Sequence, residues 1–134
     1  MEKPIMRITR FNHVGLNGNG MLDKLKEFYS SFLGLKEFER TGVAKLVNGF
    51  WAGMDVPIVH MVTDPPANGL EMPNDTHLSF YVDNINEAVA LVKARHDAIL
   101  HVGEGIDQII WFKDPAGNTL EFQKDRDIPL QAFE

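Results

Sequence analysis

Four side chains suited to metal binding recur at matching places in the two halves of the chain. His13 and His77 each lie in the first predicted strand of a half, 64 positions apart. His60 and Glu121 lie in the last predicted strand of the first and second half, 61 positions apart. Imidazole nitrogens and carboxylate oxygens bind divalent cations. Two similar halves would therefore project four ligands into one shared cleft.

Each of these residues also has a purely structural interpretation. His77 and Glu121 alternate with other polar residues along their strands, as on the wet face of a half-buried sheet. His13 and His60 have apolar neighbours and could be core histidines that bond to the backbone. The four together favour function, because a polar sheet face does not explain why all of them recur at matching places. His96 and His101 flank the end of the second predicted helix, where a histidine suits the helix dipole and solvent.

The composition narrows the ligands and the partners. The chain of 134 residues contains no cysteine, which excludes disulfides, thiol nucleophiles and thiolate metal sites. Its net charge of −6 argues against binding to nucleic acids or to anionic membranes. We find no apolar signal-peptide region and no apolar run of membrane-spanning length. We therefore expect a cytoplasmic protein that binds a small molecule.

The first half is predicted as strand, helix and strands. A strand over 7–16 leads through a Gly- and Asn-rich turn to apolar residues with helical spacing over 22–33. The stretch 35–62 is broken by glycines and a proline and fits several short strands. The Pro- and Gly-rich stretch 64–75 is predicted to be a linker.

The second half repeats this order of elements. A strand over 77–82 precedes a helix that begins at a capping box formed by Asn84 and Glu87. Short strands follow from residue 99, and the turn sequence at 114–118 predicts a hairpin between the last two. We expect one domain over 1–134, built from two modules of approximately 5–64 and 75–125.

Three motifs resemble the vicinal oxygen chelate superfamily, which includes glyoxalase I, methylmalonyl-CoA epimerase, fosfomycin-resistance enzymes, extradiol dioxygenases and bleomycin-resistance proteins. They are FNHVGL at 11–16 with FY and FLGL at 28–29 and 32–35, THLSFYVD at 76–83, and FKDPAGNTLEF at 112–122. The third is the most specific, because an Asp-Pro-x-Gly-Asn turn that leads into a Leu-Glu strand is the usual ending of that superfamily. The resemblance implies an α+β fold in which two βαβββ modules form a cup-shaped, open mixed sheet around a divalent metal.

The resemblance also assigns the ligands. His13, His77 and Glu121 match the metal ligands of the superfamily, while His60 stands where glyoxalase I has a fourth ligand, usually glutamate. The metal would be Zn, Ni, Mn, Co or Fe(II). The resemblance further implies a homodimer, in which the site either closes within one chain or is shared with the partner chain.

Three functions follow from this reading, and His60 distinguishes the first two. A glyoxalase- or epimerase-like lyase or isomerase would use the metal to stabilise an enediolate, with Glu121 serving as ligand and base in turn. An extradiol-type dioxygenase would bind Fe(II) through two histidines and one carboxylate, but needs about three open positions. We expect His60 to reach the metal, which favours the lyase or isomerase. A metal-free protein of the bleomycin-resistance type ranks last, because the ligand positions are filled.

Overall fold

Eight β-strands and two α-helices make up the described part of the chain, which is residues 6–41, 44, 48–62, 76–95 and 100–127 of a computed structural model. The fold divides into two compact units. The central unit is His13–His77, and the terminal unit combines Met1–Asn12 with Leu78–Glu134. Within the described ranges, no helix is both long and apolar enough to cross a membrane.

The central unit holds strands in the order β2-β3-β4-β1, of which β1 belongs to this unit only from His13 onward. Strands β2 (Lys36–Phe38), β3 (Gly49–Gly53) and β4 (Pro57–Val62) pair antiparallel in turn, while β4 runs parallel to β1 (Ile8–Asn17). Alternate residues of β3 and β4 form the buried core, namely Phe50, Ala52, Val59 and Met61. Because successive strand residues point to opposite faces, Trp51 and His60 lie on the other face of this sheet.

The helix that packs on this core changes its hydrogen bonding halfway. Helix α1 (Leu22–Lys26) continues as a π-helix over Glu27–Phe32, in which the Leu33 N–H donates to the Phe28 carbonyl at 2.9 Å. Helical spacing predicted one regular helix over 22–33, with its apolar residues on one face. The wider turn of a π-helix changes that spacing, and Phe32 is 71% exposed.

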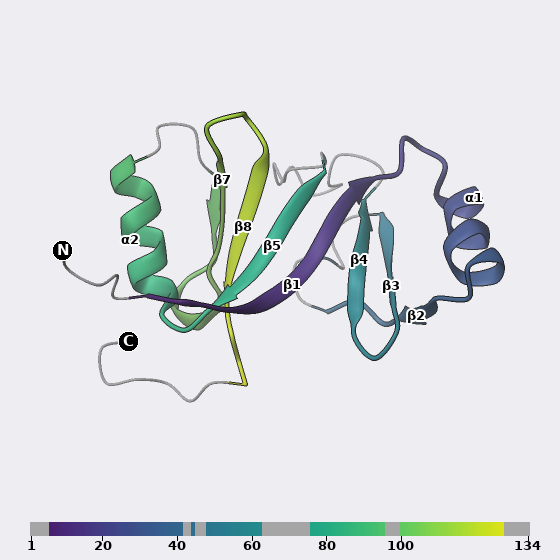
Figure 1. Ribbon diagram of the computed structural model, residues 1–134, viewed down its shortest axis with the longest axis horizontal. Helices are drawn as coiled ribbons and strands as arrows, with labels where there is room; N and C mark the ends of the chain where they lie inside the picture. Colours follow the sequence, from purple (N-terminus) through teal and green to yellow (C-terminus); the bar gives the residue numbers. More distant parts are fainter. Residues whose placement is uncertain (1–5, 42–43, 45–47, 63–75, 96–99, 128–134) are drawn as a thin grey trace. The chain divides into compact units, whose positions relative to one another are not determined.

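The terminal unit contains the same order of strands, β6-β7-β8-β5. Its elements are β5 (His77–Val82, whose first residue belongs to the central unit), α2 (Ile85–Arg95), β6 (Leu100–Val102), the 3-10 turn Gly105–Asp107, β7 (Ile109–Lys113) and β8 (Thr119–Lys124). Helix α2 lies along this sheet (Figure 1) and buries the predicted apolar face, Ile85, Ala88, Val89 and Val92. The N-cap bond of the predicted capping box is confirmed, because the Asn84 Oδ1 accepts the Glu87 N–H at 3.2 Å.

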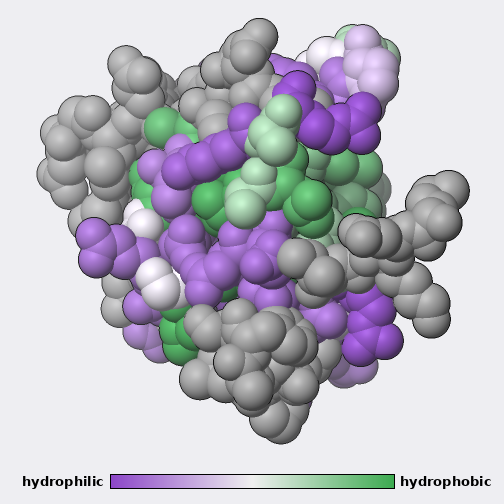
Figure 2. Space-filling view, turned by 90° about the vertical axis from the view of Figure 1, so that its left-hand side faces the viewer, coloured by the Kyte–Doolittle hydropathy of each residue, from purple (hydrophilic) through white to green (hydrophobic). Residues whose placement is uncertain are grey.

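Both halves thus run strand, helix and three strands, which confirms the glyoxalase-like α+β fold with two βαβββ modules. The predicted linker at 64–75 lies outside the described residues, and the module boundaries stay a prediction. On the α2 side of the molecule, hydrophilic and hydrophobic side chains are interspersed (Figure 2).

The predicted hairpin between β7 and β8 is confirmed, and its turn sets the register of the site. The Asp114 Oδ1 accepts the backbone N–H groups of Ala116 and Asn118, both at 2.9 Å. Gly117 has a φ of +91°, a conformation that glycine adopts without steric cost. Antiparallel pairing beyond this turn places Trp111 directly opposite Glu121.

A buried carboxylate fastens the first half of β1 within the terminal unit. The Asp125 Oδ2 accepts hydrogen bonds from the Thr9 hydroxyl at 2.6 Å and from the Arg10 Nε at 3.0 Å. Its Oδ1 accepts a third from the Arg10 Nη2 at 3.0 Å, and the Asp125 N–H donates to the Val82 carbonyl at 2.8 Å. The bonds from Arg10 hold the pKa of Asp125 at about 2, below its ordinary 3.8.

We expect Asp125→Asn to destabilise the protein at neutral pH by about 2 kcal/mol, because charge-assisted hydrogen bonds are lost. A folded-state pKa below the unfolded one means that stability is present above pH 3.8 and lost as pH falls towards about 2. Urea unfolding at several pH values checks this: the wild type should weaken over that acidic window, and the variant should weaken less. Parallel curves for the two proteins would contradict the assignment.

Candidate metal centre

Three histidines come together within the central unit, each from a different strand. The rings of His13 on β1 and His77 on β5 have centroids 5.5 Å apart and stand nearly perpendicular, at 81°. The ring of His60 on β4 stacks on His13, with centroids 3.5 Å apart and an angle of 14°. Trp51 covers the other face of His60 at 4.0 Å and 11°. The result is a column of three parallel rings with His77 standing across its end.

The place of the His77 ring depends on a glycine. A Cβ atom built on Gly15 would lie 1.9 Å from the His77 Cε1 and 2.4 Å from both ring nitrogens. No side chain tolerates such contacts, so the ring rests directly on the bare backbone of β1. Gly15 follows His13 by two positions and therefore lies on the same face of β1.

Glu121 is held from two sides within the terminal unit. The Ser79 hydroxyl on β5 donates to the Glu121 Oε2, and the Gln123 Nε2 donates to the same oxygen at 2.9 Å. Both donors therefore use Oε2, and Oε1 takes neither of these bonds. Hydrogen bonds of this kind orient a carboxylate ligand and tune its basicity.

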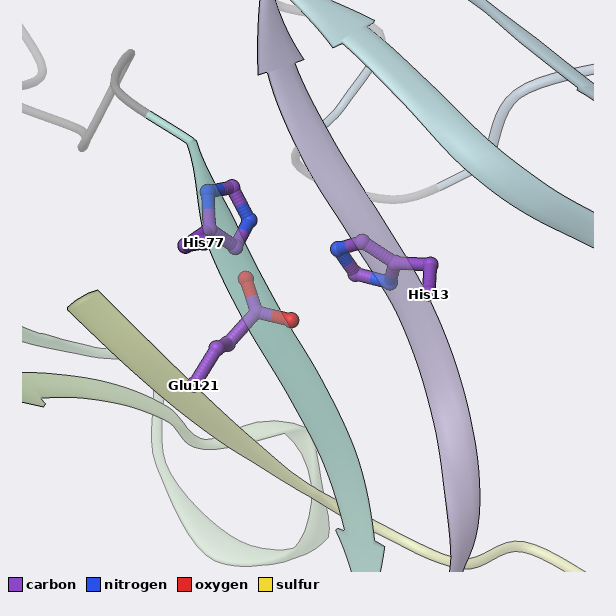
Figure 3. Close-up of side chains that lie close together, drawn as sticks. All are labelled: His13, His77 and Glu121. Atoms are coloured by element: carbon purple, nitrogen blue, oxygen red, sulfur yellow. The ribbon is translucent and has the colours of Figure 1, made fainter. Parts of the chain in front are cut away.

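His13, His77 and Glu121 form a group that could hold a metal ion (Figure 3). Each offers one ligand atom, and these atoms lie within 4.8 Å of one another. All three residues are buried, with exposures of 3, 6 and 4%. Ligand atoms bound to one ion at about 2.1 Å lie about 3–4 Å apart, so small side-chain rotations close the group. Two imidazoles and one carboxylate fit a divalent transition metal.

His60 lies beside this group but is not part of it. Its ring touches His13, as expected, yet its nitrogens are not among the ligand atoms that lie within the common distance. An imidazole binds a metal through a lone pair in the ring plane. Because the His60 and His13 rings are stacked and nearly parallel, an ion in the plane of His13 lies outside the plane of His60. Ligation by His60 stays a prediction and needs a turn of its ring.

The hydrogen bonding of His60 fixes its tautomer. Burial, with a smaller contribution from neighbouring His13, lowers the pKa of His60 to about 2, so the ring is neutral. A hydrogen bond to the Pro57 backbone acts in the opposite direction. Proline has no N–H, so the ring must donate to the carbonyl. The His60 Nε2 is buried and has no hydrogen-bond partner within the described part of the chain, so Nδ1 makes that bond and Nε2 is the acceptor.

Sequence reasoning did not assign Ser79 and Gln123 to the site. The signal was present, because each lies two positions from a predicted ligand on the same strand, His77 or Glu121. His101 bonds to the Gln108 Oε1 at 2.9 Å, in line with its structural interpretation. His96 lies outside the described residues.

The chain thus combines a buried pair of histidines and a buried carboxylate with two βαβββ modules. The family model named Glyoxalase/Bleomycin resistance protein/Dioxygenase superfamily matches residues 10–122, and the chain belongs to this superfamily. No curated protein sequence matches the chain significantly.

Solved dioxygenase structures share the fold at low sequence identity. An extradiol ring-cleaving dioxygenase from B. fuscum is 18% identical, with a TM-score of 0.65 over 91% of this chain and 34% of that chain. A homoprotocatechuate 2,3-dioxygenase variant from Brevibacterium fuscum is also 18% identical, with a TM-score of 0.64 over the same shares. This chain thus spans about a third of the length of those dioxygenases. A glyoxalase family protein from Bacillus anthracis is 21% identical, with a TM-score of 0.40 over 94% of this chain and 100% of that chain.

Proposed function

We propose that this protein is an enzyme that holds one divalent cation through His13, His77 and Glu121. The observation that carries the proposal is the buried group of two imidazoles and one carboxylate, together with the two hydrogen bonds that orient Glu121. When bound, the ion supplies Lewis acidity towards two neighbouring substrate oxygens and, as Fe(II), electron transfer with O₂.

For the reaction, we propose extradiol-type ring cleavage of a catechol. Three protein ligands leave about three positions on a six-coordinate ion, enough for a chelating catechol and O₂. The reaction breaks one ring carbon–carbon bond beside the two hydroxyl groups and places both oxygen atoms in the product. The catechol itself supplies the electrons, so no other reductant is needed. His60 supports this reaction, because its neutral Nε2 can accept a hydrogen bond from a substrate hydroxyl.

A lyase or isomerase of the glyoxalase or epimerase kind is the second candidate, and it requires the same His60 nitrogen to bind the metal. If the ring turns so that Nε2 joins the ligands, about two positions remain, enough for a chelating substrate but not for O₂ as well. Glu121 would then take a carbon-bound proton from the substrate.

The two reactions have separate readouts. Protein loaded with Fe(II) without air, then given catechol and O₂, should consume one O₂ per catechol and form a coloured ring-cleavage product. The same protein loaded with Ni(II) or Co(II) should not exchange the carbon-bound proton of an α-hydroxycarbonyl compound with D₂O. Proton exchange without O₂ uptake by the iron form would replace the oxygenase with the lyase or isomerase.

The oligomeric state and the cellular location of the protein are also matters of proposal. We propose a homodimer, as the family resemblance implies, and exposed Phe28 and Phe32 side chains provide apolar surface for a contact. Light scattering at micromolar concentration tests it. A cytoplasmic location is likewise our proposal.

A further inference from the structure

The indole of Trp111 lies on the face of the terminal sheet that carries Glu121. Trp111 and Glu121 are directly opposite in the antiparallel pair of β7 and β8, and opposite residues in such a pair share a face. Their neighbours Ile110 and Phe122, also opposite each other, lie in the core that packs against α2. Successive strand residues alternate between faces, so Trp111 points away from that core.

Trp111 combines almost complete burial with an unused donor. Its exposure is 3%, and its Nε1 has no hydrogen-bond partner among the residues that the structure describes. A buried donor without a partner is unfavourable, and buried tryptophans usually find one. Phenylalanine would fill much of the same space without this cost. The indole N–H therefore points to an acceptor that the described chain does not supply.

We propose that the Trp111 Nε1–H donates a hydrogen bond to an oxygen of the bound substrate, beside Glu121. An indole N–H can donate but cannot accept, so Trp111 selects an oxygen with a lone pair directed at it. A carbonyl oxygen or a deprotonated hydroxyl oxygen meets this requirement, and a group that can only donate, such as an ammonium, does not. Trp111 is thus a specificity-determining residue for oxygen-chelating substrates.

This inference rests on the proposed function in one respect, which is that the ligand is a compound with two neighbouring oxygens. It does not depend on the reaction, because a deprotonated catechol and an enediolate present the same acceptor. Trp111 donates to the substrate and not to the metal, so its removal should affect ligand affinity and leave metal affinity intact.

Indole NMR tests the contact without any turnover. The chain has two tryptophans, Trp51 and Trp111, so protein labelled with ¹⁵N gives two indole N–H resonances, assigned by Trp111→Phe and Trp51→Phe. In zinc-loaded protein, addition of 4-nitrocatechol should shift the Trp111 resonance downfield, as a new hydrogen bond requires.

Binding measurements on the Trp111→Phe variant are the second test. Trp111→Phe should weaken the affinity for 4-nitrocatechol about tenfold, the range expected for one lost hydrogen bond, and leave zinc affinity unchanged. A Trp111 resonance that does not move at saturation, or zinc lost from Trp111→Phe, would overturn the inference. A failure of the metal-site proposal gives a different result from a failure of the Trp111 inference, because zinc would then stay bound in the Glu121→Gln variant.

Discussion

The His77→Ala variant should lose its metal while keeping its fold. Removing one of three ligands should raise the metal dissociation constant about 100-fold or more, because even loss of an orienting partner costs 10–100-fold. Glu121→Gln should behave similarly, since an amide oxygen is a weaker ligand than a carboxylate. Metal content after dialysis and titration with Co(II) provide the measurement. His101→Ala, which removes a histidine bonded to Gln108, is the matched control.

In the same assay, the His60→Ala variant distinguishes a metal site with three protein ligands from one with four. With three ligands, it should retain metal within about tenfold of the wild type, the scale of a neighbouring side chain that only supports a ligand. Metal loss as large as that of His77→Ala would make His60 a ligand. The expected number of open positions would then fall to about two, and the preferred reaction would be the lyase or isomerase.

Gly15→Ala should weaken metal binding although it removes no ligand. The added methyl group would lie 1.9 Å from the His77 Cε1, so the ring must leave its position. We expect the dissociation constant for Co(II) to rise at least about tenfold, as for other changes that misplace a ligand. Co(II) titration and circular dichroism together separate this effect from unfolding.

Two comparisons isolate the cause in Gly15→Ala. Gly15 is not among the glycines with positive φ. Alanine at this position therefore clashes with the His77 ring but does not strain the backbone. Gly117→Ala does strain the backbone, at a φ of +91°, and should lower stability by about 1 kcal/mol with no effect on metal. Adding Gly15→Ala to His77→Ala should cost little further stability, because the clash is gone. Equal losses in both backgrounds would exclude the steric explanation.

Local patterns in the sequence predicted most elements of the fold. The Asn84 cap, the apolar face of α2 and the turn at 114–118 each depend on residues a few positions apart, so spacing and residue type identify them. The π-helix over Glu27–Phe32 was missed, because nothing in its composition distinguishes hydrogen bonds between residues five positions apart from the α-helical bonds between residues four positions apart.

The spacing of residues also predicted His13, His77 and Glu121 as candidate ligands, but it could not predict the ring orientation of His60. Strand alternation places a side chain on a face and leaves its ring angle open. That angle depends on Trp51, which pairs with His60 across β3 and β4 and fixes the stack. The unused donor of Trp111 is likewise a property of packing, which no single-sequence pattern records.

The tight turn at 114–118 also bears on the order in which the site assembles during folding. It brings Trp111 and Glu121 together across only ten positions of chain, whereas Gly15 and His60 pair across 45. Short loops close early, and a hairpin forms in about 1–10 μs, while distant parallel strands meet later. We therefore expect the carboxylate and the indole to be in register before the histidines arrive. A full-length chain that refolds would then present one oxygen ligand first, and the nitrogen ligands would complete the site as the last strands pair.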